Sequence, residues 1–450
     1  MSQKEFQNTL YTNDNLFVLK GLNSESVDLI YLDPPFKSDR VYSAPIGSKA
    51  AGVSFNDMWT WQDVNEAYLD TLAEKYPVLT KYIADVGKIH SKAMAAYLTY
   101  MAQRLIEMYR ILKNTGSLYL HCDPTACHYL KVLLDEIFDG RNFRNEIIWE
   151  RATDTGSSKA IANQFPVNTD VILFYSKSDD YVFNKQYDKY SEEYVSNKFN
   201  NNDNDGKGAY RWQVLKTYSQ ETFDKLKVEN RLKKTDTSKY YYFKQYLAES
   251  KGVRISNLWD AEDIVPLSPS AKESKGYPTQ KPLALIHRII KASSNEGDIV
   301  LDPFCGCATT CVAAQQLGRK WIGIDIEKKA VDILIERLSD DAGLFNDFIN
   351  TTLIPQRTDV KIETPSKSIK EQLYKKQNGM CNACGMEFDI WNLEIDHIIP
   401  KTKGGGDYYE NYQLLCSSCN KIKGDRPMEY LRMKIETRER MMKNKIIFGE

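Results

Sequence analysis

The chain has 450 residues, a length that suggests about three domains, each able to bury its own core. Its 42% hydrophobic and 27% charged residues are typical of a soluble globular protein, and no apolar run approaches the roughly 20 residues of a membrane span, so we expect no membrane partner. The formal net charge is -1, so the overall charge gives no support for nucleic-acid binding. Such binding would need local basic patches.

The amino-terminal residues Met1–Glu5 lack the basic-then-apolar pattern of a signal peptide, and we therefore expect a cytoplasmic protein. Residues Tyr11–Lys20 predict a polar turn that opens a short amphipathic helix, with Asp14 as its N-cap. These residues give no independent support for a contact between this turn and the adenine of a cofactor.

The apolar stretch from Ser26 to Leu32 predicts a buried strand, which ends in Asp33-Pro34-Pro35-Phe36. The two prolines make a rigid turn at the carboxyl end of the strand, where open α/β sheets bind ligands. Because proline has no N–H group, the turn offers only carbonyl oxygens and one carboxylate. It suits a donor-rich partner such as the amino group of a flipped base, with Asp33 and the Pro34 carbonyl as acceptors and Phe36 stacked on the ring. The same residues also fit an ordinary loop.

Residues 38 to 85 are turn-rich and fit either a lid over this strand end or a packing excursion; their aromatic residues are Phe55, Trp59, Trp61 and Tyr68. From Ser91 to Leu112 the apolar residues recur at helical spacing, and we expect Asn114-Thr115-Gly116 to end the helix. A strand (117–123), a helix (124–138) and a strand (145–149) follow, an alternation that predicts a parallel sheet covered by helices. We expect His121 and His128 to be packed or solvated rather than ligands.

Between Arg151 and Lys275 the periodicity weakens and Asn, Lys, Asp and Tyr become frequent, after one more core strand at 170–175. Basic residues at 231–234 and aromatic residues at 240–243 would suit contacts with phosphates and bases. The same composition also fits an irregular solvated insertion, so both interpretations stay open on these residues alone.

The second motif is the stretch from Gly297 to Thr310, in which a strand runs through Asp302-Pro303-Phe304-Cys305-Gly306 into a helix. A further strand ends at Asp325, about 20 residues on, where Rossmann-type folds place an acid for ribose hydroxyls. The loop has only one glycine at the crossing, so it is not a dinucleotide fingerprint. Its acid suits an adenosine-bearing ligand with a positively charged sulfur, and the alternative is a strand-turn-helix without a ligand.

Residues 351–366 contain two prolines and no periodicity, which predicts an interdomain linker. Beyond it, two Cys-x-x-Cys pairs have the spacing of one closed tetrahedral zinc site and are formed by Cys381, Cys384, Cys416 and Cys419. We expect the other five cysteines to be small core residues: Cys122, Cys127, Cys305, Cys307 and Cys311.

Four residues between and after the cysteine pairs are candidates for chemistry, namely the domain's only histidine, His397, with Asp396, Asn411 and Asn420. Asp396 and Asn420 would hold a divalent cation while His397 deprotonates water for attack on a phosphodiester. The alternative is a zinc module that only binds DNA or a partner.

With both motifs placed, Asp33-Pro34-Pro35-Phe36 resembles the catalytic motif of DNA amino-methyltransferases, and Asp302-Pro303-Phe304-Cys305-Gly306 resembles their S-adenosylmethionine loop. The catalytic motif comes first, which is the order of the β class, to which type III modification subunits belong. Further matches cover most of residues 8–340 and include the stretches 116–123, 145–149, 258–260 and 276–282.

This resemblance implies that Asp33, Pro34, Pro35 and Phe36 receive the flipped base. It also implies cofactor contacts from Asp302 and Gly306 to the methionine moiety, from Asp325 to the ribose and from Asp14 and Asn15 to the adenine, with Pro303, Phe304, Thr309 and Lys281 as further cofactor-binding residues. The family loop usually reads Gly-Ser-Gly-Thr-Thr, whereas Ala308 replaces the second glycine here; its small side chain keeps cofactor binding as the expectation.

Residues 367–450 resemble an HNH endonuclease with zinc-binding cysteine pairs. The resemblance implies that His397 and Asn411 are catalytic and that Asp396 and Asn420 hold Mg²⁺ or a similar divalent cation. The final ligand position is often histidine in this family, and asparagine is a weaker ligand.

We therefore expect an α/β protein with a Rossmann-like S-adenosylmethionine-dependent methyltransferase of permuted motif order, a target-recognition insertion and a zinc-stapled ββα-metal HNH domain. The expected boundaries are 1–150 for the catalytic part, 151–275 for target recognition, 276–350 for the cofactor-binding part, 351–366 for the linker and 367–450 for the HNH domain.

The leading hypothesis is a methyltransferase that acts on adenine N6 in double-stranded DNA, fused to a nuclease in restriction-modification. Such a protein would be nucleoid-associated, with a second copy or a further restriction-system subunit as its protein partner. Methyl transfer would be direct, because Pro34-Pro35 offers no nucleophilic cysteine. Three alternatives stay open: cytosine N4 as the target, a zinc domain that only binds DNA, and a DNA-binding protein without enzymatic activity.

Overall fold

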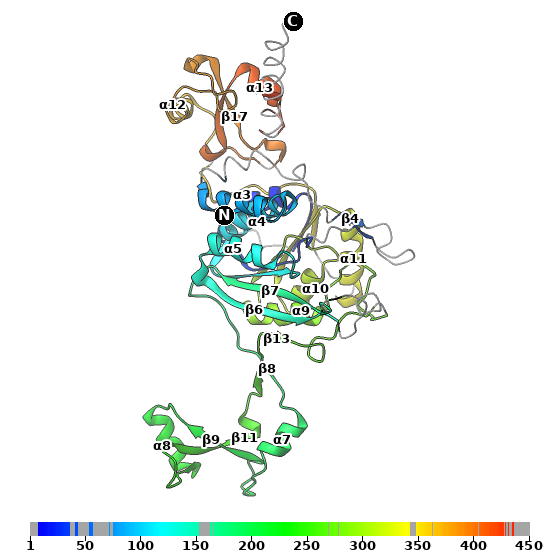
Figure 1. The fold of residues 1–450 in the computed structure, drawn as a ribbon, viewed down its shortest axis with the longest axis vertical. Helices are drawn as coiled ribbons and strands as arrows, with labels where there is room; N and C mark the ends of the chain where they lie inside the picture. Colours follow the sequence, from blue (N-terminus) through cyan, green and yellow to red (C-terminus); the bar gives the residue numbers. More distant parts are fainter. Residues whose placement is uncertain are drawn as a thin grey trace. The chain divides into compact units, whose positions relative to one another are not determined.

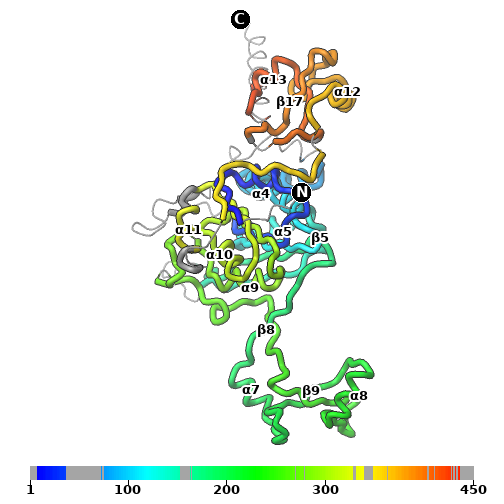
Figure 2. The backbone as a smooth tube through the Cα atoms, turned by 180° about the vertical axis from the view of Figure 1, so that it is seen from behind, coloured from blue at the N-terminus to red at the C-terminus, as the bar shows by residue number. Residues whose placement is uncertain are grey.

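The computed structural model describes residues 8–36, 41–43, 54–56, 72, 75–152, 163, 165–268, 270–277, 279–342, 348–361, 363–403, 405–426, 428, 431 and 434–435. Trp59, Trp61 and Tyr68, from the stretch considered as a lid, lie outside this set. The chain divides into two compact units, Met1–Asn184 with Asn257–Glu450, and Lys185–Ser256 (Figure 1). The second unit is an insertion, which the backbone trace in Figure 2 enters and leaves once. Within the described residues, no helix is long and apolar enough to cross a membrane.

A nine-stranded sheet forms the centre of the first unit, in the order β13-β6-β7-β5-β2-β14-β15-β1-β16. Its strands are β1 (Thr9–Thr12), β2 (Val27–Leu32), β5 (Leu112–Cys122), β6 (Phe143–Glu150), β7 (Thr169–Ser176), β13 (Leu258–Trp259), β14 (Ile299–Asp302), β15 (Lys320–Asp325) and β16 (Ile349–Thr351). Neighbours are parallel except at β7, which runs antiparallel to both β5 and β6. The predicted parallel sheet is therefore mixed, because β6 and β7 are consecutive strands that pair directly with each other. A separate antiparallel pair is formed by β3 (Val41–Ser43) and β4 (Ser54–Asn56).

Helices pack on this sheet in two groups, one of α1, α3, α4 and α5 and one of α9, α10 and α11. Their bounds are α1 (Asn15–Gly21), α3 (Pro77–Ile89), α4 (Lys92–Ile111), α5 (Cys127–Phe138), α9 (Leu283–Ser293), α10 (Thr309–Gln316) and α11 (Lys328–Ala342). The predicted cap of α1 is confirmed, because Asp14 accepts a hydrogen bond from the Leu16 N–H at 2.8 Å. The predicted end of α4 at Asn114-Thr115-Gly116 is wrong, because β5 begins at Leu112 and contains these residues.

The predicted linker is held against the turn that follows α1. Asn23 exchanges two hydrogen bonds with Thr358, at 2.7 and 2.8 Å, and the Ser24 N–H donates to Asp359 at 2.9 Å. These bonds hold Thr358 and Asp359 of the predicted linker beside this turn.

The carboxyl-terminal part has its own core, built around an antiparallel hairpin of β17 (Leu393–His397) and β18 (Tyr412–Cys416). Helices α12 (Lys367–Lys376) and α13 (Ser417–Lys423) complete it. The hairpin and α13 form a small ββα arrangement, as the sequence predicts.

The second unit contains an antiparallel sheet in the order β10-β11-β9 and a two-stranded pair of β8 and β12. Its elements are β8 (Tyr187–Asp188), α7 (Glu192–Lys198), β9 (Tyr210–Leu215), α8 (Gln220–Val228), β10 (Leu232–Lys233), β11 (Tyr241–Tyr246) and β12 (Val253–Arg254).

Candidate active site and metal centre

Three neighbouring parallel strands, β2, β14 and β15, end at the same edge of the large sheet, each beside an acidic residue. Asp33 follows β2, Asp302 ends β14 and Asp325 ends β15. A cavity of about 530 Å³ opens there. All residues predicted for the first motif and for the cofactor line it, namely Asp14, Asn15, Asp33, Pro34, Pro35, Phe36, Lys281, Asp302, Pro303, Phe304, Gly306, Thr309 and Asp325.

Side-chain hydrogen bonds fix the loop between β14 and α10. The Asp302 carboxylate accepts from the Phe304 N–H at 3.0 Å and from the Thr310 hydroxyl at 2.5 Å. Gly306 has a φ of 48°, and its N–H donates to Asp325 at 2.7 Å, so the loop meets the end of β15. Ala308 has a φ of 58°, a left-handed conformation that costs a non-glycine residue roughly 1–2 kcal/mol. The replacement of glycine noted in the sequence therefore falls at a position that favours glycine.

The buried acids give the cavity an electrostatic preference. Burial raises the pKa of Asp302 to about 7 and that of Asp325 to about 6, although each accepts hydrogen bonds that oppose the shift. A positively charged ligand would stabilise both carboxylates, so the cavity favours a cation over an anionic phosphate.

Among the described residues, the two carboxylate oxygens of Asp33 differ in their contacts. Lys281 Nζ donates to Asp33 Oδ2 at 2.5 Å, and both side chains are largely buried. Asp33 Oδ1 is buried and has no hydrogen-bond partner among the described residues. A buried acceptor without a partner is costly, so this oxygen is available to a ligand that donates an N–H. Lys281, which we expected to contact the cofactor, lines the same cavity but makes this contact to the catalytic motif.

Sequence reasoning missed a buried network of polar contacts around His121, next to Phe36. The His121 ring is fully buried, stacks on Phe36 with ring centres 5.7 Å apart, and contacts the Tyr31 hydroxyl at 3.0 Å. Its other nitrogen lies 3.2 Å from Asp170, which also pairs with Arg151. His121 is packed, as expected, but it supports the site as well. The available signal was the place of His121 near the end of the predicted strand 117–123.

Arg104 is a second residue that the sequence did not single out. Its guanidinium donates to Asn15 at 2.6 Å and to Asp14 at 3.1 Å, and it lies over the Tyr100 ring. Asn15 in turn donates to the Pro303 carbonyl at 2.8 Å. Arg104 thus joins the start of α1 to the loop after β14.

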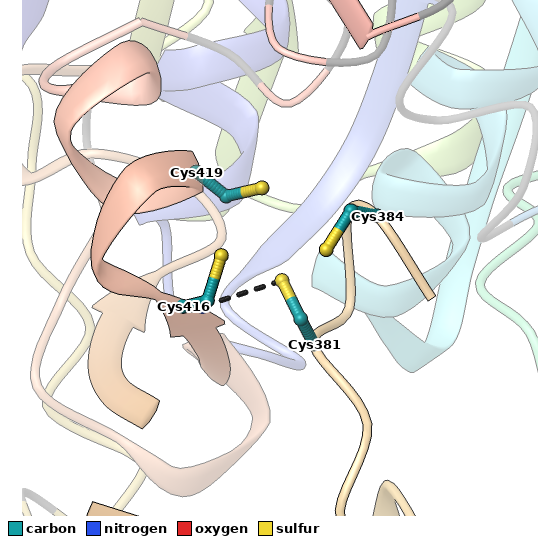
Figure 3. Close-up of side chains that lie close together, drawn as sticks. All are labelled: Cys381, Cys384, Cys416 and Cys419. Atoms are coloured by element: carbon teal, nitrogen blue, oxygen red, sulfur yellow. Dashed lines mark hydrogen bonds between the residues drawn. The ribbon is translucent and has the colours of Figure 1, made fainter. Parts of the chain in front are cut away.

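The four cysteines of the two Cys-x-x-Cys pairs point toward one another (Figure 3), and their sulfur atoms all lie within 4.8 Å of each other. The Cys416 N–H also donates to the Cys381 sulfur at 3.3 Å. Zinc–sulfur bonds of about 2.3 Å in a tetrahedron need sulfurs roughly 4 Å apart, so the cluster fits a closed structural zinc site. The predicted metal ligands Cys381, Cys384, Cys416 and Cys419 thus come together.

The other predicted residues of this domain are in separate contacts. Asp396 binds Lys423 Nζ at 3.0 Å and Gln413 at 2.8 Å, whereas Asn420 donates to Glu394 at 2.5 Å. Within the described residues, the cysteines are the only group of three or more histidine, cysteine or acidic side chains suited to a metal. The structure therefore does not bring Asp396 and Asn420 into one cation site.

His397 contacts a carboxylate that the sequence did not indicate. His397 Nε2 lies 2.8 Å from Asp407, which also accepts from Lys401 at 2.6 Å and from Tyr412 at 2.9 Å. The hydrogen bond from Lys401 is the main reason why the pKa of Asp407 falls to about 2. Asp407 therefore orients the ring through Nε2, and Nδ1 has no hydrogen-bond partner among the described residues.

Asn411 holds the loop that joins β17 to β18. Its side chain accepts from the Ile399 N–H at 2.9 Å and donates to the Ile399 and Gly406 carbonyls at 3.1 and 3.0 Å. In this arrangement Asn411 shapes the loop beside His397 through backbone contacts.

Comparisons with known proteins give separate matches for the region of the large cavity and for the domain with the four cysteines. The family model described as DNA methylase matches residues 27–336, and that described as HNH endonuclease matches residues 381–426. The chain is 30% identical over 377 residues to the type II methyltransferase M.EcaI of Enterobacter cloacae, covering 78% of this chain and 73% of that protein. It is 26% identical over 330 residues to the DNA adenine methyltransferase YhdJ of Escherichia coli, covering 73% and 82%. Identity to the Mod subunit of the type III enzyme StyLTI of Salmonella typhimurium is 25% over 354 residues, covering 70% and 51%.

Replacement of Asp302 should change how stability depends on pH. The ordinary pKa of this carboxyl is 3.8 and the folded value is about 7, so between these values the folded state keeps a proton that the unfolded state loses. The free energy of unfolding contributed by Asp302 therefore falls as the pH rises from about 4 to 7. We expect Asp302→Asn to unfold at a higher temperature than wild type at pH 8 and at a similar one at pH 5. For the exposed control Asp180→Asn, the difference in unfolding temperature from wild type should be the same at pH 5 and pH 8. An equal pH response of both variants would contradict the assigned role of Asp302.

Removal of the metal should unfold the carboxyl-terminal part alone. We expect one zinc per chain by elemental analysis, and loss of protease resistance in residues 367–426 after treatment with a chelator. Cys384→Ser should reproduce this loss without a chelator, whereas the exposed neighbour Met386→Ala should keep both zinc and resistance. Retention of zinc by Cys384→Ser would exclude the four-cysteine site.

Proposed function

Because the chain belongs to the DNA methylase family, we propose that it transfers a methyl group from S-adenosylmethionine to the exocyclic amino group of adenine in DNA. The observation that carries the proposal is the open oxygen of Asp33, a buried acceptor on a side chain that lines the cavity. It offers a polar contact for one N–H of an amino group, and the Pro34 carbonyl offers the second.

The residues of the first motif would activate the amino group by position. Lys281 holds Asp33 Oδ2 and leaves Oδ1 as the acceptor. Two hydrogen bonds from the amino group to Asp33 and Pro34 draw its lone pair out of conjugation with the ring and direct it at the methyl donor. Phe36, supported from behind by His121, provides a flat apolar surface for the base.

The other half of the cavity suits the cofactor. When bound, S-adenosylmethionine supplies an electrophilic methyl group on a positively charged sulfur. Asp302 and Asp325 would balance its positive charges and hold its ribose, and the loop at Gly306 presents backbone with little side chain. An added Cβ at Gly306 would lie 3.1 Å from the Tyr277 ring, so this narrow passage favours glycine.

Adenine is the proposed target in preference to cytosine. A cytosine amino group carries the same two N–H donors, so the acceptors alone do not distinguish N6 from N4. The likeness to a DNA adenine methyltransferase and the aspartate at the first motif position favour adenine.

We also propose that residues 151–275 recognise the target sequence. The compact unit Lys185–Ser256 falls within this range, and its sheet carries lysines interleaved with aromatic residues. Such side chains suit contacts with phosphates and bases.

Asp33→Ala should lower the rate of methyl transfer by about 10²- to 10³-fold, because the reacting amino group loses a preorganised acceptor. The affinity for S-adenosylmethionine should change by less than about threefold, since Asp33 belongs to the base side of the cavity. Transfer of labelled methyl groups and equilibrium binding of the cofactor measure the two quantities. A variant that keeps wild-type transfer would exclude this role for Asp33.

Mass spectrometry of digested product DNA then identifies the methylated base. N6-methyladenine is the expected product. N4-methylcytosine would keep the acceptor geometry and overturn the choice of base.

A second activity is proposed for the HNH domain, namely cleavage of DNA that lacks the modification. The supporting observation is the contact of His397 Nε2 with the ionised Asp407, which leaves Nδ1 to take a proton from water. Asp396 and Asn420 as cation ligands stay a prediction. Because Asp396 is paired with Lys423 and Asn420 is hydrogen-bonded to Glu394, we assign no step of the reaction to a cation.

His397→Ala should abolish cutting of unmodified plasmid in the presence of Mg²⁺ and leave methyl transfer intact. The exposed His128→Ala is the matched control and should cut like wild type. Plasmid fully methylated by the His397→Ala protein should resist wild type. If wild type cuts nothing while it methylates, or if His397→Ala cuts equally well, the domain serves DNA binding instead.

A further inference from the structure

The inserted unit carries a net positive charge. Residues 185–256 contain 15 lysine and arginine residues against 10 aspartate and glutamate residues, a net charge of +5, whereas the whole chain carries -1. The unit thus supplies the local basic patch that the overall charge does not indicate.

The sheet of this unit has two different faces. In the register of β9 and β11, Lys244 pairs with Trp212 and Tyr246 with Tyr210, and Lys233 of β10 pairs with Tyr242. Because side chains of paired residues share a face, these six form one surface, which we call the basic aromatic face. Lys233 and Lys244 lie over the Trp212 ring at 5.5 and 5.9 Å.

The opposite face is covered by helices. Arg211 contacts the Tyr194 hydroxyl of α7 at 2.5 Å, and Tyr241 packs edge-on against Phe223 of α8 with ring centres 5.1 Å apart. The basic aromatic face instead meets a short loop, residues 202–207, which precedes β9.

Two carboxylates of this loop bind the basic aromatic face. Asp203 accepts from the Tyr210 hydroxyl at 2.8 Å and from Lys244 Nζ, and Asp205 accepts from the Tyr246 hydroxyl at 2.5 Å. The hydrogen bond from Lys244 lowers the pKa of Asp203, and that from Tyr246 lowers the pKa of Asp205, so both are ionised at neutral pH. The two carboxylates thus accept hydrogen bonds from ammonium and hydroxyl donors of the sheet, and these donors are not free for another acceptor.

We propose that the basic aromatic face binds the sugar–phosphate backbone of duplex DNA, and that Asp203 and Asp205 are internal competitors which DNA phosphates displace. This inference rests on the proposed recognition of DNA by residues 151–275. Lysine and tyrosine are common donors to phosphate oxygens, and a carboxylate is the closest side-chain equivalent of that acceptor. The loop lowers the affinity for any DNA, because its release must precede or accompany phosphate contact.

Two glycines in and beside the loop have open space around them. Gly206 and Gly208 both have positive φ values, and an added Cβ at either would meet no atom within 4 Å. The loop is therefore tied to the face through its two carboxylates and through Lys207, whose Nζ lies 5.6 Å from the centre of the Tyr246 ring, rather than through packing at these glycines.

The test compares wild type with the double variant Asp203→Asn/Asp205→Asn in binding to a labelled duplex without target sites, over 50 to 200 mM salt. Asparagine keeps an acceptor for both tyrosines but loses the charge, so the fold of the unit should survive. We expect about 10-fold tighter binding at 100 mM salt and a log–log salt slope that is steeper by about one, as expected for one added phosphate contact. The Michaelis constant for DNA should fall, and that for S-adenosylmethionine should not change.

A matched control separates this effect from net charge. Asp224→Asn/Asp236→Asn removes two exposed carboxylates of the same unit and should tighten binding by less than about threefold. In wild type, where Lys244 is paired with Asp203, Lys244→Gln should weaken DNA binding little. In the Asp203→Asn/Asp205→Asn background, the fold-loss of affinity caused by Lys244→Gln should be at least three times larger.

Equal effects of the loop variant and the control variant, or an unchanged salt slope, would overturn the competitor role. Tighter binding of single-stranded than duplex DNA by the loop variant would overturn the choice of duplex backbone. Wild-type protein that neither binds nor methylates DNA would instead refute the proposed function, so the two failures are distinguishable.

Discussion

The parallel pairing of β2 with β14 is the constraint on which the methyltransferase site depends. Leu29 lies opposite Val300 and Ile30 opposite Leu301, and Asp28 fixes this register by accepting from the Ile299 N–H at 2.9 Å. Because both strands run in the same direction, the motifs that follow them open onto the same edge of the sheet. Two segments from opposite ends of the methylase region thereby share one cavity, one with acceptors for a base and one with acids for a cationic cofactor.

The buried acids of this cavity lower the stability of the folded protein, and the same acids favour binding of a cationic ligand. A buried carboxylate loses hydration, and this desolvation is the main cause of the raised pKa values of Asp302 and Asp325. Asp33 Oδ1, which has no partner within the part of the chain that the structure describes, and the left-handed Ala308 add two further unfavourable features at the same edge. All of them lie where a ligand would relieve or use them, which is the pattern expected of a functional site rather than of a core.

Much of this arrangement was predictable because the motifs are local. An apolar run followed by Asp33-Pro34-Pro35-Phe36 specifies both a strand and the chemistry at its end, and the cysteine spacing specifies the zinc ligands. The contacts of Lys281 with Asp33, of His121 with Asp170 and of His397 with Asp407 were not predictable, because strand order and loop course bring these pairs together. The same reason explains why the contacts of Asp396 in the HNH domain were not predictable. Consecutive residues of a strand face opposite ways, so Asp396 and His397 have separate surroundings, with Lys423 beside the first.

On the proposed function, the same acceptors that select the substrate also release the product. An unmodified amino group carries two N–H donors, one for Asp33 Oδ1 and one for the Pro34 carbonyl, so the base leaves neither acceptor unpaired. When the amino nitrogen takes the methyl group it gives up one proton to solvent and the cofactor leaves as the neutral thioether, so only one N–H remains. One buried acceptor then loses its partner at a cost of about 1–3 kcal/mol. The flipped state of a methylated base is therefore less stable in this pocket than that of an unmodified base. A chain that uses one recognition unit for both methylation and cleavage thus has, in the base pocket itself, a physical difference between modified and unmodified DNA.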